Sequence, residues 1–170
     1  MSTIEIDTRE LRNAFGCFAT GITVVTTLDG EGGAVGITAN SFSSLSLDPP
    51  LVLWSIDKRS TTYPVFATSP HFVVSVLSAE GAPIASRFAM KGGHEIQGER
   101  TVPTALGPPT FSDSLAVFEC DVFARHEGGD HVIMVGKVRR FTHLPEDDGR
   151  DCGPLLYFRG RFGNVTPLTE

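Results

Sequence analysis

The sequence predicts a mainly β protein, built as an antiparallel barrel with a few short helices outside it. About seven short runs are typical of strands, and most of them are joined by turns rich in Gly, Asp and Pro. Strands and helices do not alternate regularly, as a doubly wound parallel sheet would require, and no GxGxxG follows a predicted strand. With 170 residues, of which 41% are hydrophobic, the chain is long enough for one substantial core, so we expect a single domain over residues 1–170.

Composition argues against several classes of function. The net charge of -6, from 14 basic and 20 acidic residues, lacks the excess of cations that nucleic-acid binding needs. No apolar run reaches the roughly 20 residues of a membrane-spanning helix, and residues 1–10 are polar and acidic, so we expect a cytoplasmic protein without a membrane partner. The cysteines are widely spaced and form no CxxC, and no HExxH is present, so we expect neither a disulfide framework nor a metal site. They are Cys17, Cys120 and Cys152.

The first predicted elements are a helix and a β-hairpin. Residues 7–10 have the form of a capping box, and apolar side chains then recur at helical spacing until Gly21. The β-branched run 22–27 favours a strand. The turn at Asp29-Gly30 leads into a second strand over residues 34–39.

Small hydroxyl and amide side chains then dominate residues 36–51, which we call the Ser-rich segment. Small side chains let a backbone approach a flat ligand, and Ser, Thr and Asn form hydrogen bonds without carrying charge, as suits the rim of a flavin ring or a phosphate. The same residue types dominate turns, so a loop that ends in a Pro-Pro turn is the alternative. Taken alone, this segment is compatible with both interpretations.

The middle of the chain predicts two more strands and a short helix between them. Residues 51–56 are apolar enough for a strand inside a sheet, and residues 71–77 form a further strand. Residues 60–68 are compatible with a helix because Pro64 falls in its first turn, where a missing N–H donor is tolerated.

A second helix and a long loop follow. Residues 78–90 place apolar side chains on one helical face, although Gly81 weakens the pattern. Periodicity disappears over residues 91–110, which predicts a loop that is either a lid, a binding element or merely mobile.

The last third of the chain contains the clearest hairpin signal. Residues 115–124 and 131–138 read as two strands around a turn at residues 128–130. An acidic, Gly-rich loop is expected over residues 144–153, and a last short strand over residues 155–158.

Four motifs occur in one order along the chain: residues 18–27, the Ser-rich segment, Gly129-Asp130-His131, and residues 154–160. Together they resemble the flavin reductase family, which includes the small reductase components of two-component flavin-dependent monooxygenases. The resemblance runs from about residue 11 to residue 162 and implies an antiparallel Greek-key split β-barrel of the FMN-binding type, usually a homodimer. It also implies that NADH or NADPH reduces FMN or FAD, and that the reduced flavin passes to a partner oxygenase.

The chemistry implied by the resemblance asks the protein mainly to place two rings. Hydride passes from nicotinamide C4 to flavin N5, so the protein must stack the rings and stabilise the anionic reduced flavin with hydrogen-bond donors. The residues implied for the isoalloxazine ring are Thr38, Ala39, Asn40 and Ser41. Those implied for the ribityl chain and phosphate are Ser55, Ile56, Lys58, Ser60 and Thr61.

Three further residues complete the predicted site. His131 is the candidate catalytic residue, facing the nicotinamide, and its alternative is a polar residue at a strand start bonded to the opposite loop. Phe88 either contacts the flavin or belongs to the core, and Arg159 pairs with a phosphate, with the partner subunit or with a surface carboxylate. Lys58 and Ser60 have plain alternatives as a solvated turn charge and a helix cap.

One departure from the family pattern keeps other functions open. Residues 91–110 resemble the family poorly, with Ile96 and Gln97 near the place of an expected aromatic residue. The alternative function is therefore a flavin-binding carrier on the same barrel that is a slow reductase or none at all. A pyridoxamine-phosphate-oxidase-like enzyme would need basic residues beyond Lys58, Arg59 and Arg161.

Overall fold

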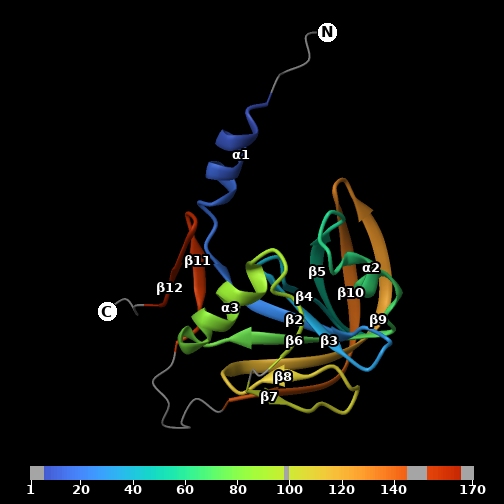
Figure 1. The fold of residues 1–170 in the computed structure, drawn as a ribbon. Coiled ribbons are helices and arrows are strands. Elements are labelled where there is room, and N and C mark those ends of the chain that lie inside the picture. Colours follow the sequence, from blue (N-terminus) through green and yellow to red (C-terminus); the bar gives the residue numbers. More distant parts are fainter. Residues whose placement is uncertain (1–5, 98–99, 145–152, 166–170) are drawn as a thin grey trace.

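The computed structural model describes residues 6–97, 100–144 and 153–165. Its largest element is a seven-stranded sheet in the order β3-β2-β6-β9-β10-β5-β4, in which every neighbouring pair is antiparallel. The strands are β2 (Thr23–Leu28), β3 (Ala34–Ala39), β4 (Ser43–Leu47), β5 (Pro50–Asp57), β6 (His71–Leu77), β9 (Ser114–Gly128) and β10 (His131–His143). The sheet curves strongly, so that β5 and β10 stand upright while β2, β3 and β6 lie across them (Figure 1). The predicted mainly β, antiparallel fold class is confirmed.

Short helices lie outside this sheet, as the sequence predicts. They are α1 (Thr8–Phe15), α2 (Tyr63–Thr68), the 3-10 helix η1 (Ala79–Gly81) and α3 (Ala82–Ala89). The side chain of Asp7 caps α1 by accepting hydrogen bonds from the backbone N–H groups of Arg9 and Glu10 at 2.8 and 3.3 Å. Pro64 lies in the first turn of α2, as expected. The predicted helix over residues 78–90 is divided, with Gly81 at the end of its 3-10 turn.

Helix α1 extends away from the sheet and buries none of its residues (Figure 1). Its packing against the rest of the chain is confined to its C-terminal end. There the backbone N–H of Arg159 donates to the carbonyl oxygen of Gly16 at 2.9 Å. The amphipathic pattern therefore predicts the helix correctly, but its apolar side is not part of the core of this chain.

The structure corrects several predicted boundaries. The Ser-rich segment is not a loop throughout, because Ser43–Leu47 pairs with β5 as strand β4. Because β4 is the last strand of the sheet, this pairing satisfies the backbone groups on one side of it. Strands β9 and β10 both extend further than the apolar runs that predicted them, because residues 125–128 pair with the start of β10 and residues 140–143 pair with the start of β9. Most of the predicted loop 144–153 lies outside the described residues.

Short strands form two smaller sheets. In and just after the predicted loop 91–110, β7 pairs with β8, and near the C-terminus β11 lies between β1 and β12. Their bounds are β1 (Thr20–Gly21), β7 (Thr101–Val102), β8 (Thr110–Phe111), β11 (Leu156–Phe158) and β12 (Arg161–Gly163). The strand predicted over residues 155–158 is confirmed as β11. The other four were missed, because two or three residues are too few to give a period-2 signal.

Two apolar clusters hold the main sheet in place. In the first, Trp54 packs edge-on against Phe66 and Phe72, with ring centroids 5.1 and 5.9 Å apart. In the second, Phe88 packs against Phe111 at 5.4 Å. A Cβ at Gly36 would come within 3.1 Å of the Phe88 ring, so the close approach of β3 to α3 favours glycine there.

The first part of the predicted long loop is attached to the free edge of β3. The backbone N–H of Gly36 donates to the carbonyl of His94 at 2.8 Å, and the N–H of Ile96 donates to the carbonyl of Ala34 at 3.0 Å. Ile96 also packs against the second apolar cluster. These contacts fix the chain around residues 94–96 beside the strand that leads into the Ser-rich segment. In the residues that the structure describes, no helix is both long and apolar enough to span a membrane.

Candidate active site

One hydroxyl group extends the contact between the Ser-rich segment and β5 beyond strand β4. Ser41 Oγ accepts a hydrogen bond from the backbone N–H of Ser55 at 2.9 Å and donates one to the carbonyl oxygen of Ser55 at 3.2 Å. Because β3 lies at one end of the seven-stranded sheet and β5 is next to its other end, this contact joins the two ends. It brings the predicted isoalloxazine residues next to the predicted phosphate residues.

The neighbours of Ser41 differ in what they expose. Thr38 directs its hydroxyl to the carbonyl oxygen of Ala85 in α3 at 2.7 Å, and Ala39 is 8% exposed. Asn40 is exposed. Of these predicted residues, Asn40 therefore has the side chain most open to a ligand, while Thr38 and Ser41 hold the segment in place.

Strand β5 alternates between a buried and a half-buried face. Ile56 is 1% exposed and belongs to the first apolar cluster, so its side chain faces the core. Ser55 and Asp57 lie on the opposite face, because successive side chains of a strand alternate. In the pairing with β10, His131 lies directly opposite Asp57. Ser55, Asp57 and His131 therefore lie on one face of the sheet, and Ser41 is hydrogen-bonded to the backbone of Ser55.

Lys58 is bound to the β9–β10 hairpin. Its Nζ forms an ion pair with the carboxylate of Glu127 and donates to the carbonyl oxygen of Gly129 at 2.8 Å. The hydrogen bond to Glu127 raises the pKa of Lys58 above its usual value. The ammonium group is therefore held beside the start of β10. Lys58 lies in the turn after β5 and is partly exposed, as the turn-charge alternative predicts, but its charge is paired with Glu127.

Charged groups that the sequence reasoning gave no role surround His131. Arg59 donates to the carboxylate of Asp57 through Nε at 3.1 Å and through a terminal nitrogen at 2.8 Å, which lowers the pKa of Asp57 to about 2. His131 Nδ1 lies 2.7 Å from Asp130 Oδ1, and this hydrogen bond lowers the pKa of Asp130. The Asp-x-Arg spacing at the end of a strand and the Asp next to His131 were the available signals.

Ser60 and Thr61 occupy the turn before α2. Ser60 Oγ lies 2.8 Å from Thr62 Oγ1 and accepts a longer bond, 3.3 Å, from the backbone N–H of Thr62. Thr62, and not Ser60, is the N-cap residue of α2, so the helix-cap alternative for Ser60 is wrong, although its hydroxyl contacts the cap residue. Thr61 is exposed beside it.

Phe88 lies in the core. Its side chain is 0% exposed and packs in the second apolar cluster. The guanidinium group of Arg87 lies 5.0 Å from the centre of its ring. Contact between this ring and a flavin would require the core to open, so the structure favours the core interpretation.

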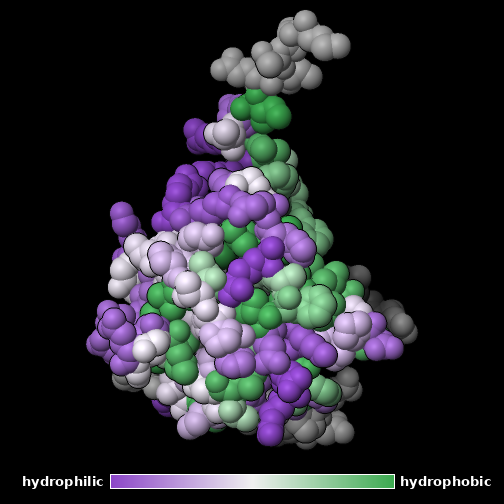
Figure 2. Space-filling view, turned by 90° about the vertical axis from the view of Figure 1, so that its right-hand side faces the viewer, coloured by the Kyte–Doolittle hydropathy of each residue, from purple (hydrophilic) through white to green (hydrophobic). Residues whose placement is uncertain are grey.

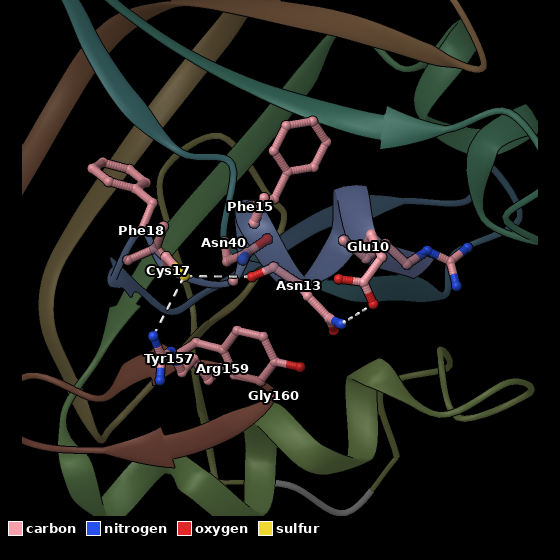
Figure 3. A pocket seen from close by; sticks show the side chains of 13 residues that line it. Glu10, Asn13, Phe15, Cys17, Phe18, Asn40, Tyr157, Arg159 and Gly160 are labelled. Atoms are coloured by element: carbon pink, nitrogen blue, oxygen red, sulfur yellow. Dashed lines mark hydrogen bonds between the residues drawn. The ribbon is translucent and has the colours of Figure 1, made fainter. Parts of the chain in front are cut away.

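A cleft with a volume of about 1160 Å³ lies between α1 and β11. Figure 3 shows Tyr157 and Arg159 on one side of it, facing Asn13 and Cys17 of the α1 end. Two residues predicted from the sequence, Asn40 and Arg159, lie in this cleft. The other lining residues were missed, although the apolar run that continues past the end of α1 was a signal. They are Glu10, Arg12, Asn13, Ala14, Phe15, Gly16, Cys17, Phe18, Thr20, Tyr157 and Gly160.

Arg159 adopts an unusual backbone conformation at this cleft. With φ of 47°, it is the one non-glycine residue with positive φ in the described part of the chain, and Gly160 follows at 79°. Positive φ at both residues of a two-residue hairpin loop is the pattern of a type I′ turn. The guanidinium group of Arg159 lies 3.7 Å from Cys17 Sγ and 5.3 Å from the centre of the Phe158 ring. Among the described residues, no carboxylate pairs with it.

The donor chemistry around Asn40 suits a flavin. Uncharged amide and hydroxyl groups lie at Asn40 and Thr20, and Thr20 Oγ1 is buried without a partner among the described residues. Arg159 supplies a cation in the cleft, and Lys58 supplies another beside His131. Among the described side chains, no group of three or more His, Cys, Asp or Glu is arranged to hold a metal ion.

Comparisons with known proteins identify the family of this chain. The family model described as "Flavin reductase like domain" matches residues 15–166. The FMN reductase (NADH) SmoA of Agrobacterium fabrum is 44% identical over 166 residues, which cover 94% of this chain and 87% of that protein. The reductase subunit HsaB of a flavin-dependent monooxygenase from Mycobacterium tuberculosis is 37% identical, with 96% and 85% covered.

Solved structures show the same fold. The NADH:FAD oxidoreductase SgcE6 of Streptomyces globisporus, in complex with NAD and FAD fragments, superposes with a TM-score of 0.87 at 34% identity over 100% of both chains. The flavin reductase PheA2 superposes with a TM-score of 0.84 at 32% identity, covering 95% of this chain and 100% of that one. The family model covers most of the chain, and curated relatives exceed 30% identity over nearly all of it, so this chain belongs to the flavin reductase like family.

Proposed function

We propose that this chain is an NADH-dependent flavin reductase that transfers hydride to FMN or FAD. The observation that carries the proposal is the row Ser55, Asp57 and His131 on one face of the β5–β10 pair, together with the Ser41–Ser55 contact that attaches the Ser-rich segment to it. This row joins the segment predicted for the flavin ring to the residue predicted for the nicotinamide. The names of the relatives support the reaction, because they include an FMN reductase (NADH) and an NADH:FAD oxidoreductase.

The proposed division of labour follows from which side chains are free. When bound, the flavin accepts hydride at its ring, and the protein supplies position and hydrogen bonds. The exposed amide of Asn40 is proposed to meet the ring, while Ser41 holds the backbone beside it. Lys58 is proposed to meet the phosphate, sharing its charge with Glu127, since three ammonium protons serve more than one acceptor.

The enzyme assay tests this function directly. Purified protein is mixed with NADH or NADPH and with FMN or FAD, and oxidation is followed at the nicotinamide absorbance with and without oxygen. We expect fast, flavin-dependent oxidation of NADH. If flavin fluorescence is quenched by the protein but NADH is not oxidised, the reductase proposal is wrong and the flavin carrier replaces it.

We further propose that the reduced flavin passes to a monooxygenase. Relatives are described as the reductase subunit or component of flavin-dependent monooxygenases, which supports such a partner. The cytoplasmic location remains a prediction from the composition of the N-terminal residues.

We also propose that the chain forms a homodimer through α1. The side chains of Ile6, Leu11, Phe15 and Phe18 are 63%, 38%, 68% and 77% exposed. Figure 2 shows hydrophobic surface along one side of the projecting helix. Contiguous exposed apolar surface of this kind is typical of association sites. A Phe15→Ser, Phe18→Ser double variant should elute as a monomer in size-exclusion chromatography with light scattering, and an unchanged mass would exclude α1 from the interface.

A further inference from the structure

We propose that Asp130 is a positioning residue for His131, fixing which ring nitrogen carries the proton and which one faces the substrate. This inference rests on the proposed function, because it assigns His131 to the nicotinamide. It starts from one contact, the 2.7 Å hydrogen bond between His131 Nδ1 and Asp130 Oδ1. In the described part of the chain, this is the one hydrogen bond of the imidazole ring.

The chemistry of the two groups decides the direction of that hydrogen bond. Asp130 is an exposed carboxyl group, which is ionised at neutral pH, and a carboxylate only accepts hydrogen bonds. Nδ1 must therefore be the donor and carry a proton. Nε2, which has no hydrogen bond among the described residues, then has a free lone pair whenever the ring is neutral. An acceptor at this atom suits the N–H groups of a nicotinamide carboxamide.

The turn geometry keeps the carboxylate in reach of the ring. Gly129 has φ of 72°, the positive value that the first position of a two-residue hairpin loop requires here. The carbonyl oxygen of Asp130 also accepts a hydrogen bond from the backbone N–H of Lys58 at 3.0 Å. The backbone of Asp130 is thus fixed to the end of β5, while its side chain remains 70% exposed.

The other charged side chains near His131 form ion pairs with groups other than its imidazole ring. Asp57 lies opposite His131 in the β5–β10 pairing, but its carboxylate is held by Arg59. Glu127 is paired with Lys58. Arg59 approaches the second oxygen of Asp130 at 3.8 Å and leaves Oδ1 to the ring. Asp130 is therefore the carboxylate that hydrogen-bonds the imidazole.

Because Asp130 is so exposed, its pair with His131 adds little to folding stability. Replacing the carboxylate by an amide should leave the fold intact. Asp130→Asn keeps the size of the side chain, but an amide can donate as well as accept, so the ring is no longer forced to carry its proton on Nδ1. The variant therefore separates positioning from folding.

The experiment combines NMR with kinetics on the full chain. Long-range ¹⁵N–¹H spectra of ¹⁵N-histidine-labelled protein report the tautomer of each neutral imidazole, and the signal missing in His131→Ala assigns His131. We expect His131 to be protonated at Nδ1 in the native protein and to become a mixture of tautomers in Asp130→Asn. Asp113→Asn, before the opposite end of β9, is the matched control and should change neither the tautomer nor the kinetics.

The kinetic arm uses NADH oxidation with saturating flavin. Asp130→Asn should lower kcat/KM for NADH on the order of tenfold, the factor that one hydrogen bond is typically worth. It should have no further effect in the His131→Ala background, because a positioning residue acts through the residue it positions. Asp130→Glu should restore part of the loss.

Each outcome leads to a separate conclusion. A native ring protonated only at Nε2 overturns the positioning role of Asp130, whatever the kinetics show. The expected tautomer with an additive kinetic loss in the double variant also overturns it, because Asp130 would then act independently of His131. If His131→Ala leaves NADH kinetics unchanged, the proposed role of His131 fails instead, and the NMR result alone decides whether Asp130 sets the tautomer.

Discussion

The side chain of Ser41 satisfies both backbone groups of Ser55, accepting from its N–H at 2.9 Å and donating to its carbonyl oxygen at 3.2 Å. One hydroxyl thus takes the place of a further rung of the β4–β5 ladder, two residues beyond the pairing of Ser43 with Leu53. It fixes the exposed Asn40 next to the row of groups that leads to His131. The position of the proposed flavin site therefore depends on a residue that need not touch the flavin.

Ser41→Ala should weaken the attachment of the proposed flavin site to β5 without removing a group that contacts the flavin. The substitution removes both hydrogen bonds and leaves two half-buried backbone groups of Ser55 without their partner, at a cost of about 1–3 kcal/mol of unfolding free energy. We expect a weaker flavin affinity together with this loss of stability. Urea unfolding and quenching of flavin fluorescence measure the two effects.

Ser43→Ala is the matched control for this substitution. Ser43 is exposed in β4, and its hydroxyl bonds only to the adjacent carbonyl of Ser44. It should change stability by less than about 0.5 kcal/mol. Equal effects of the two alanine variants would show that the Ser41–Ser55 contact has no special role.

Lys58 offers a test that separates a ligand role from an ion pair. Lys58→Met removes the ammonium group and the ion pair with it. Glu127→Gln breaks the same ion pair but keeps the ammonium group. If Lys58 binds the flavin phosphate, the first variant should weaken flavin binding about tenfold, as expected for a charge-assisted hydrogen bond. The second should leave flavin binding equal or stronger, because the ammonium no longer shares its charge. An equal loss of flavin affinity in both variants would mean that Lys58 only stabilises the β9–β10 hairpin.

Asp57 makes folding stability depend on pH in the acid range. Its pKa falls from 3.8 to about 2 through the hydrogen bonds from Arg59. A depressed pKa stabilises the folded state fully above the unfolded value, and this contribution disappears as the pH falls from about 4 towards 2. Asp57→Asn should flatten the pH dependence of the urea midpoint within that window. Glu80→Gln, an exposed carboxylate in η1 without a described ion pair, should keep the native slope.

The sequence predicted the elements that depend on local patterns. The capping side chain of Asp7, the β-branched run of β2 and the glycine turn before His131 each carry their information within a few residues. The contacts within the site were predicted less well than these elements, because they depend on pairing between strands that are distant in the sequence. The Ser41–Ser55 contact and the Arg59–Asp57 pair next to His131 arise from the order of strands, which periodicity does not encode. Ile56 and Phe88 show the converse, since family resemblance named residues whose side chains the fold buries.

Arg159 combines a strained backbone conformation with a side chain in the cleft, so one substitution can separate the two properties. A non-glycine residue in the left-handed region costs on the order of 1 kcal/mol, and Asn tolerates this conformation better than Arg. Arg159→Asn should therefore keep or slightly raise the thermal midpoint while removing the guanidinium from the cleft. If that group serves flavin binding or the dimer, flavin affinity or dimer mass should fall despite the unchanged stability. Arg161→Asn, from the neighbouring strand β12 with ordinary φ, is the control, and equal effects of both variants would reduce the role of Arg159 to general positive charge.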